Sequence, residues 1–342
     1  MSVSDFVLHH DEFMSSYFGD CAKYNVNSIP IEERQHVSVG ILFVAIGILC
    51  QMLYIPCLYA IYLQIKLNRF ATCYKFMFYL GIVDTIGLMI TGPFCGVASI
   101  QGLVYCQRPV SSYIVCVIGF FGWFAANTTT LILAINRCMV LYDDHLADQL
   151  FKGRRGTMWL ILPTMAGFVG VWVSPALYYN PIDSSALFNP HRHYLPDEPI
   201  FHSAAHVTFN WIIVLAIPSI YITFAVFFAN RLRSGGMLSL RNNRKLAREL
   251  STFLQVLITS TLVVSTSLGF IYQEYLKSFP IFVFVGYIMY QGSPAFIYLC
   301  MNQSIRNTLL SKSSKIYQSS NVAPSNAPPT RDQNVSKNDT AT

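Results

Sequence analysis

The stretch 37-VSVGILFVAIGILCQMLYIPCLYAIYLQI-65 contains no charged side chain, and it decides the fold of the chain. A helix of about 20 apolar residues is long enough to cross the ~30 Å hydrocarbon core of a bilayer. The whole composition agrees, because 53% of the 342 residues are hydrophobic and only 12% are charged. Soluble domains carry about 25% charged residues. The sequence therefore predicts an integral membrane protein and excludes an ordinary soluble enzyme, a coiled coil and a disordered chain.

Seven stretches of this kind occur along the chain. They cover residues 37–65, 76–98, 109–135, 157–179, 207–229, 250–273 and 279–301. The sequence thus predicts an all-α membrane protein, a seven-transmembrane helix bundle. Residues 1–36 form a segment before the first span, without the basic-then-apolar pattern of a signal peptide. We expect a juxtamembrane amphipathic segment over residues 302–315 and a disordered, Ser- and Asn-rich tail over residues 316–342.

Lys and Arg residues are distributed unevenly between the two sides of these spans. Eighteen of the 23 lie between spans one and two, three and four, or five and six, or follow span seven. The other side keeps Lys23, Arg34, Arg108, Arg192 and Lys277. Because cytosolic loops of membrane proteins are enriched in Lys and Arg, we expect the N-terminus outside and the C-terminus in the cytosol.

Asp84 is the one acidic residue within a predicted span. A charge at the bilayer centre costs about 2.5–3.5 kcal/mol on insertion scales, so this side chain should face the bundle interior. At about 1.5 Å per helical residue, Asn127, Tyr290 and Ser293 lie at about the same depth. The pattern predicts an internal polar layer, able to hold water or a cation; the alternative is a hydrogen bond between helices that only fixes their packing.

Basic and helix-breaking residues mark the cytosolic ends of the spans. Asn136 and Arg137 end the third span, and Pro294 breaks backbone hydrogen bonding in the last span, one turn before Tyr298. The linker before span six contains six bases, among them Arg244, Lys245 and Arg248, beside apolar residues at helical spacing. This amphipathic pattern suits a partner helix. The alternative is that the bases anchor the linker to anionic membrane lipid.

Taken in order, these features resemble the rhodopsin-like G-protein-coupled receptors, and more closely the nematode serpentine chemoreceptors of the srt class. The resemblance covers about residues 30–306. Its motifs are Leu80-Gly81-Ile82-Val83-Asp84, Cys73-Tyr74-Lys75, Gln101-Gly102 through Tyr105-Cys106 with Pro109, Leu133 to Cys138, Pro218, Pro294 with Ile297-Tyr298-Leu299, and Asn302-Gln303-Ser304-Ile305-Arg306.

The resemblance implies a plasma-membrane receptor that detects an external small molecule and activates a heterotrimeric G protein. It assigns coupling and activation to Asn136, Arg137, Pro294, Tyr298 and the linker bases. Asn136 stands where most rhodopsin-like receptors have an acid, so an ionic latch from that neighbour is absent.

Cys106 matches the cysteine that tops the third span in these receptors. Residues 180–206, where its usual partner lies, contain no cysteine. Cys21 and Cys95 are the alternative partners, and free thiols are the remaining possibility.

Ligand-binding residues are harder to predict. Trp123, Phe124 and Trp211 fall where they could line a pocket for a small apolar molecule, although Trp123 and Trp211 could equally face lipid. The pairs His191/His193 and His202/His206 have spacings that metal sites use, but we expect solvated histidines and no metal.

The sequence also bears on other classes of function, namely enzymes, other receptors and transporters. Motifs for a nucleotide loop, a zinc protease or a nucleophile elbow are absent from the sequence. We therefore expect no enzyme, no cofactor and no nucleic-acid partner. A peptide or neuromodulator receptor of the same fold remains an alternative. A transporter is disfavoured, because transporters tend to have matching halves and several intramembrane charges.

Overall fold

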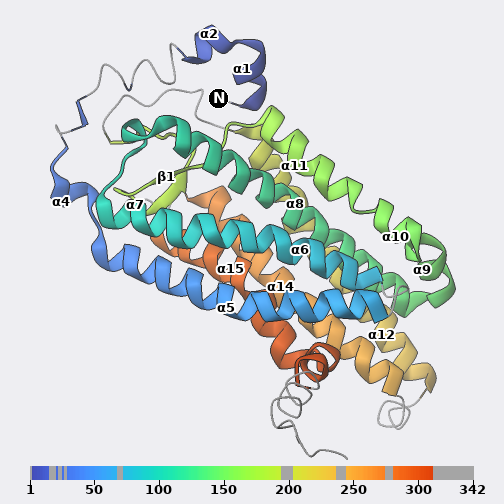
Figure 1. Cartoon of the computed structure of the whole chain (residues 1–342). Coiled ribbons are helices and arrows are strands. Elements are labelled where there is room, and N and C mark those ends of the chain that lie inside the picture. Colours follow the sequence, from blue (N-terminus) through green and yellow to red (C-terminus); the bar gives the residue numbers. More distant parts are fainter. Residues whose placement is uncertain are drawn as a thin grey trace, which may run out of the picture.

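The chain folds into an elongated bundle of long helices (Figure 1). The computed structural model describes residues 2–14, 21, 25–26, 29–67, 72–193, 203–235, 244–273 and 280–310. The expected tail over residues 316–342 and the end of the juxtamembrane segment, residues 311–315, lie outside these ranges.

Seven helices within the described ranges are long and apolar enough to cross a membrane. In chain order the elements that form them are α4 (Ile31–Arg34) with α5 (Val37–Leu67); α6 (Thr72–Met89), η3 (Ile90–Phe94) and α7 (Cys95–Gln101); α8 (Pro109–Tyr142); α10 (Arg154–Met158) with α11 (Ile161–Val173); α12 (Ala204–Gly235); α14 (Arg244–Tyr272); and α15 (Pro280–Met301). The seven-transmembrane bundle predicted from the sequence is therefore confirmed.

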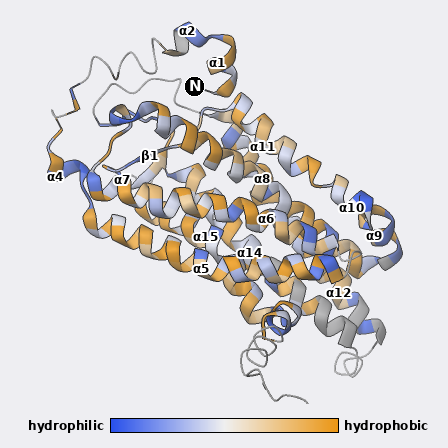
Figure 2. Ribbon diagram, viewed as in Figure 1, coloured by the Kyte–Doolittle hydropathy of each residue, from blue (hydrophilic) through white to orange (hydrophobic). Residues whose placement is uncertain are grey.

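The outward faces of the bundle are apolar. On α11, large hydrophobic side chains such as Met165, Phe168 and Trp172 are exposed, and α5 exposes Leu49, Met52 and Ile55 in the same way. Figure 2 shows hydrophobic residues along these helices and hydrophilic ones gathered at α9 and α10. So much apolar exposure is stable only against lipid, which fits a multi-pass membrane protein.

One end of the bundle is closed by a short antiparallel hairpin, and we call it the hairpin end (Figure 1). The strands are β1 (Tyr178–Asn180) and β2 (Ser185–Leu187), with Tyr179 paired to Ala186. Every residue of both strands is buried. The short helices α1 (Val3–Leu8) and α2 (His10–Phe13) lie at this end, as does the 3-10 turn η4 (Tyr105–Gln107).

The opposite end carries the polar connection between α8 and α11. We call it the arginine end, after Arg137 near the end of α8. There α9 (Asp144–Phe151) is tied to α6, because Lys75 Nζ donates to the Gly153 carbonyl at 2.9 Å and Thr72 donates to the Phe151 carbonyl. Residues 303–310 form a further helix. It packs back on the bundle through fully buried Ile305 and a 2.7 Å hydrogen bond from Gln64 of α5 to Thr308.

The fourth span ends earlier than the sequence predicts. Helix α11 stops at Val173, whereas the expected span ran from 157 to 179. Ser174 takes extended backbone angles, as the residue before a proline usually does, and Pro175 follows it. The apolar run beyond this point, which extended the predicted span, forms the buried strand β1.

Glycines bring α5 against the second span more closely than any other residue would permit. A Cβ on Gly47 would stand 2.8 Å from Gly92 Cα, and one on Gly40 would stand 2.4 Å from the Gly96 carbonyl oxygen. Small residues allow this approach of helix backbones inside membranes. Gly92 lies in the π-helical turn η3, which also contains Pro93.

We predict that Gly47→Ala separates α5 from η3 and destabilises the protein by about 1–3 kcal/mol, the usual cost of overpacking. The obstructing atom is backbone, so no side-chain rotation can relieve the contact. The matched control is Gly286→Ala in α15, where an added Cβ meets nothing within 4 Å. Thermal unfolding of the purified protein in detergent measures both. Equal midpoints for the two variants would contradict the close contact.

Candidate functional site

Asp84 is buried in the bundle and paired with a residue that the sequence did not single out. The Tyr54 hydroxyl of α5 donates to Asp84 Oδ2 at 2.7 Å, and both side chains are at most 1% exposed. Asp84 also interacts electrostatically with Tyr290 and Tyr298 of α15. One carboxylate on α6 therefore binds α5 directly and influences two phenols of α15.

Asn127 and Tyr290 form a second polar pair across the bundle. The Tyr290 hydroxyl lies 3.5 Å from Asn127 Oδ1, and the Asn127 amide donates to the Trp123 carbonyl one turn earlier at 2.9 Å. Ser293 lies nearby on α15, but its hydroxyl donates to the Tyr290 carbonyl of its own helix. The predicted four-residue layer thus appears as two pairs, Asp84–Tyr54 and Asn127–Tyr290, with Ser293 bonded to α15.

Trp123 connects this polar region to the hairpin end. Its ring centroid lies 5.9 Å from that of Tyr290 and 5.3 Å from that of Tyr287. Its indole Nε1 donates to Asn210 Oδ1 of α12 at 3.1 Å. Asn210 in turn contacts His206, with the two side-chain nitrogens 3.2 Å apart. Trp123 therefore joins α8, α12 and α15 at one point.

A cavity of about 40 Å³ lies between Trp123 and the hairpin. Six aromatic rings line it, from Phe120, Trp123, Tyr179, Phe270, Phe284 and Tyr287, and the other lining residues include Thr91, Cys95 and Cys116. This volume holds about three water molecules. Pockets for drug-sized ligands measure about 300–1,000 Å³, so the structure has a closed conformation of this region.

The three aromatic residues predicted to line a pocket differ in position. Trp123 lines the cavity. Phe124 is buried beside it, with its ring 4.6 Å from that of Phe209 and 6.3 Å from that of His206. Trp211 does not line the cavity; its side chain is 38% exposed on the bundle surface and contacts Tyr272. Trp211 therefore does not contact this cavity, because α12 turns its side chain towards the bundle surface.

Asn136 and Arg137 are buried at the arginine end, with 4% and 9% of their surfaces exposed. Arg137 interacts electrostatically with Tyr74 of α6 and Tyr298 of α15. Tyr298 interacts with Asp84 as well, so it stands in the fields of both charges. Pro294 is buried one turn before Tyr298.

Helices α12 and α14 are joined towards the same end. The rings of Phe224 and Phe253 stack with centroids 3.5 Å apart, and the Tyr221 hydroxyl lies 2.7 Å from Ser260 Oγ. Helix α14 begins at Arg244, so the predicted coupling residues Arg244, Lys245 and Arg248 belong to its first turns.

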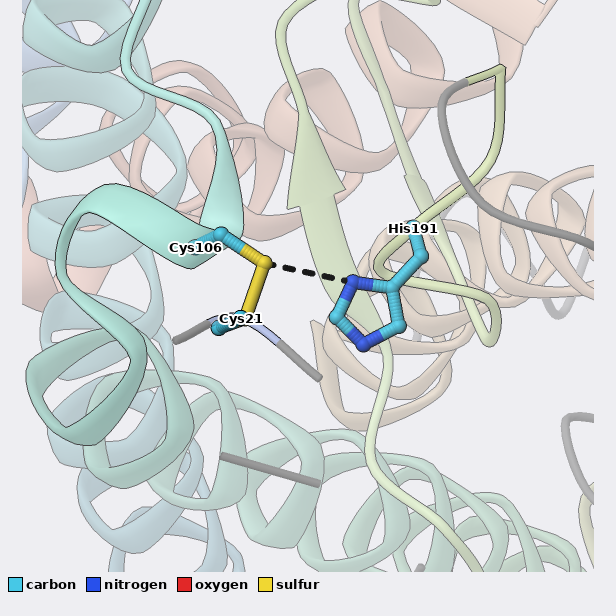
Figure 3. A group of neighbouring side chains, drawn as sticks. All are labelled: Cys21, Cys106 and His191. Atoms are coloured by element: carbon cyan, nitrogen blue, oxygen red, sulfur yellow. Dashed lines mark hydrogen bonds between the residues drawn. A yellow bond between two sulfur atoms is a disulfide. The ribbon is translucent and has the colours of Figure 1, made fainter. Parts of the chain in front are cut away.

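A disulfide joins Cys21 to Cys106 at the hairpin end (Figure 3). Cys95, the other partner considered from the sequence, is a buried free thiol. His191 Nδ1 lies 3.5 Å from Cys106 Sγ, and the three ligand atoms of Cys21, Cys106 and His191 fall within 4.8 Å of one another. Because both sulfurs are bonded to each other, neither offers the thiolate that a metal requires.

The other histidines of the predicted pairs also lie apart. His193 Nε2 is 3.0 Å from the Asp183 carboxylate, whereas His191 packs beside Tyr105. His206 is 1% exposed inside the bundle rather than at its rim. His202 lies outside the described residues. The sequence could not find the His206–Asn210–Trp123 group, because pairing across helices depends on the rotation of each helix.

Comparisons with known proteins agree with this arrangement. Residues 5–321 match the family model described as serpentine type 7TM GPCR chemoreceptor Srt. The chain is 20% identical over 295 residues to serpentine receptor class T-55 of Caenorhabditis elegans, which covers 85% of this chain and 79% of that protein. Its fold is similar to the crystal structure of squid rhodopsin, with a TM-score of 0.63, 12% identity, and coverage of 88% of this chain and 94% of that one.

We predict that Tyr54→Phe lowers stability by about 1–3 kcal/mol, because it leaves the buried Asp84 side chain without its hydrogen-bond donor. Asp84→Asn alone should keep the side-chain volume and insert normally. In the double variant the loss of the phenol should cost less, with a coupling of about 0.5–3 kcal/mol for residues in contact. Thermal unfolding of the four proteins measures this cycle. Strictly additive effects would show that the pair contributes nothing, and Ser219→Ala, at an exposed serine of α12, serves as the control.

Proposed function

We propose that this chain, which belongs to the Srt family of serpentine seven-transmembrane chemoreceptors, detects an external small molecule and activates a heterotrimeric G protein. The observation that carries the proposal is a series of buried side chains between the two ends of the bundle. It begins at the cavity with Trp123, whose ring lies 5.9 Å from that of Tyr290, and continues with the buried side chains of Tyr298 and Arg137. The plasma membrane is the location that gives such a receptor access to an external ligand.

We infer further that the hairpin end faces outside and the arginine end faces the cytosol. The excess of Lys and Arg in the loops at the arginine end supports this orientation. The disulfide at the hairpin end supports it independently, since disulfides persist in oxidising, extracellular environments.

In this proposal a ligand acts by favouring one arrangement of the helices over another. A molecule that enters the cavity must displace the ring of Trp123 or its neighbours, because about 40 Å³ is too small to admit it. Tyr290 lies against Trp123 and in the field of Asp84, so it would move with the ring. Tyr298 would then change the surroundings of Arg137.

The partner surface in this proposal lies at the arginine end. Opening the bundle would expose Arg137, which is buried here, beside the bases at the start of α14. Those bases would meet a partner helix on one side and anionic membrane lipid on the other. Asn136 cannot form an ion pair with Arg137, so the inactive state would lack that lock and signal measurably without ligand.

The orientation can be tested with epitope tags at residues 2 and 342. We predict that antibody labels the first tag on intact cells and the second only after permeabilisation. Each tag in a separate, otherwise unchanged protein controls for the other. Labelling of residue 342 on intact cells would refute both the orientation and the direction of signalling.

Coupling can be tested without a known ligand through basal nucleotide exchange. We predict that membranes containing the receptor accelerate GTPγS binding to added heterotrimers, and that Arg137→Ala reduces this rate to that of receptor-free membranes. The loss follows because Arg137 is the buried charge that opening would present to the partner.

The matched control is Lys152→Ala at the same end. Lys152 is exposed and pairs with Asp148 at 2.6 Å, and exposed pairs contribute little to stability. Its removal should leave exchange unchanged at equal surface density. If Arg137→Ala and the parent accelerate exchange equally, coupling through this end is refuted.

A further inference from the structure

A directional chain of hydrogen bonds begins at Trp123 in the cavity wall and runs away from the cavity to α12. Trp123 Nε1 donates to Asn210 Oδ1 at 3.1 Å, and Asn210 Nδ2 lies 3.2 Å from His206 Nε2. An indole can only donate, so the Asn210 oxygen must face Trp123 and its amino group must face the imidazole. The imidazole nitrogen at that contact therefore accepts, and His206 is neutral in this arrangement.

The surroundings of His206 suit the neutral ring. Its neighbours are the rings of Phe120 and Phe124 of α8, Phe188 after β2, and Phe270 of α14, at 5.2–6.3 Å between centroids. None of these rings carries a charge. Protonation would place an N–H against the Asn210 amino group and would turn the amide away from Trp123.

The cavity itself is uncharged and almost wholly apolar. None of its lining residues in the described part of the chain is Asp, Glu, Lys, Arg or His. Among its lining residues, the Thr91 hydroxyl donates to Gln291, the Tyr179 hydroxyl bonds Ser99, and the Trp123 indole N–H is directed at Asn210. Burial raises the pKa of Tyr179 in β1, so its phenol remains protonated.

This composition separates classes of ligand. An ammonium group would lose its hydration without gaining a counter-charge, which is costly in an apolar site. Asp84 does not line the cavity, and its carboxylate accepts from Tyr54. A carboxylate group on a ligand would find no positive charge in the cavity, only neutral hydrogen-bond donors. A neutral molecule with one acceptor atom loses little hydration, and the Trp123 N–H can bind that atom once its bond to Asn210 is broken.

A ligand can enter only if the cavity enlarges, and this step distinguishes one class of ligand from another. The hydrogen bond between Trp123 and Asn210 joins α8 to α12, and separating these helices to admit a ligand would break it. A buried N–H left unpaired carries the full cost of its lost hydration. A ligand that accepts from the indole removes that cost, whereas a pure hydrocarbon does not.

Resting on the proposed receptor function, we propose that the cavity selects small neutral molecules with one hydrogen-bond acceptor, such as a ketone, ether or aromatic nitrogen. The acceptor takes the Trp123 N–H in place of Asn210. Amines and carboxylates are rejected.

The test uses three probes with the same eight-carbon skeleton: acetophenone, ethylbenzene and 1-phenylethylamine. Their binding to the full-length receptor in lipid nanodiscs is measured by saturation-transfer NMR titration, without G protein. We expect acetophenone to bind about tenfold more tightly than ethylbenzene, the ratio for one net hydrogen bond. The amine, protonated at pH 7, should bind more weakly than either.

Two variants should change the relative affinity for acetophenone in opposite directions. Trp123→Phe keeps an aromatic ring, enlarges the cavity for every probe and removes the donor, so the ratio of acetophenone to ethylbenzene affinity should fall to about one. Asn210→Leu frees the indole N–H from its partner, so acetophenone should bind more tightly. Trp211→Phe, at the neighbouring exposed tryptophan, should change neither affinity.

Three results would overturn the proposal: equal affinities of the ketone and hydrocarbon, tightest binding by the amine, or no binding by any probe. A purely structural role for these residues would lower stability without a change specific to the ketone. Because no G protein is present, failure of the Arg137 experiment would leave this result intact, and failure here would leave coupling intact.

Discussion

The carboxylate of Asp84 has to be paired inside the bundle, and that requirement fixes how three helices face one another. A charge exposed to hydrocarbon costs several kcal/mol, so α6 must turn this residue inward. Tyr54 supplies the donor from α5, and α15 packs on both α5 and α6 with Tyr290 and Tyr298 buried. Moving any of the three helices would therefore disturb a buried polar pair that cannot reach water.

The second span contributes both Asp84 and part of the cavity lining, because its helix is not uniform. The π-helical turn η3 changes the residue count per turn between Asp84 and Cys95. Pro93 lacks an N–H, and the turn accommodates the missing hydrogen bond. Thr91 and Cys95 therefore reach the cavity while Asp84 faces Tyr54. The glycines of α5 admit this wider turn, since a Cβ on Gly92 would stand 2.7 Å from Gly47 Cα.

The sequence predicts features that stand out from an apolar background, such as charged residues. It does not predict contacts that depend on how each helix is rotated about its axis. The seven spans, Asp84 and Arg137 were identifiable because charges are rare and blocks of apolar residues are long. Tyr54 was not, because it is one of 20 tyrosines and a phenol is ordinary in an apolar helix. Strand β1 was hidden for a related reason, since its aromatic residues continue the apolar run of the fourth span. Trp211 illustrates this dependence, because successive residues of an α-helix are rotated about its axis: Asn210 is buried, whereas its neighbour Trp211 is exposed.

The helix that can move with least loss of packing also carries the hydrogen-bond partner of Trp123. Only 17% of the α12 span is buried, against 50% for the second span and 56% for α15. It carries Asn210 and His206 at the hairpin end, and Pro218 removes a backbone donor below them. Towards the arginine end its Phe224 stacks on Phe253 of α14. In contrast, α8 is held at its hairpin end, because the disulfide ties down Cys106 just before it. We therefore expect a ligand that breaks the Trp123–Asn210 bond to displace α12 rather than α8, and α14 to follow through the stacked rings.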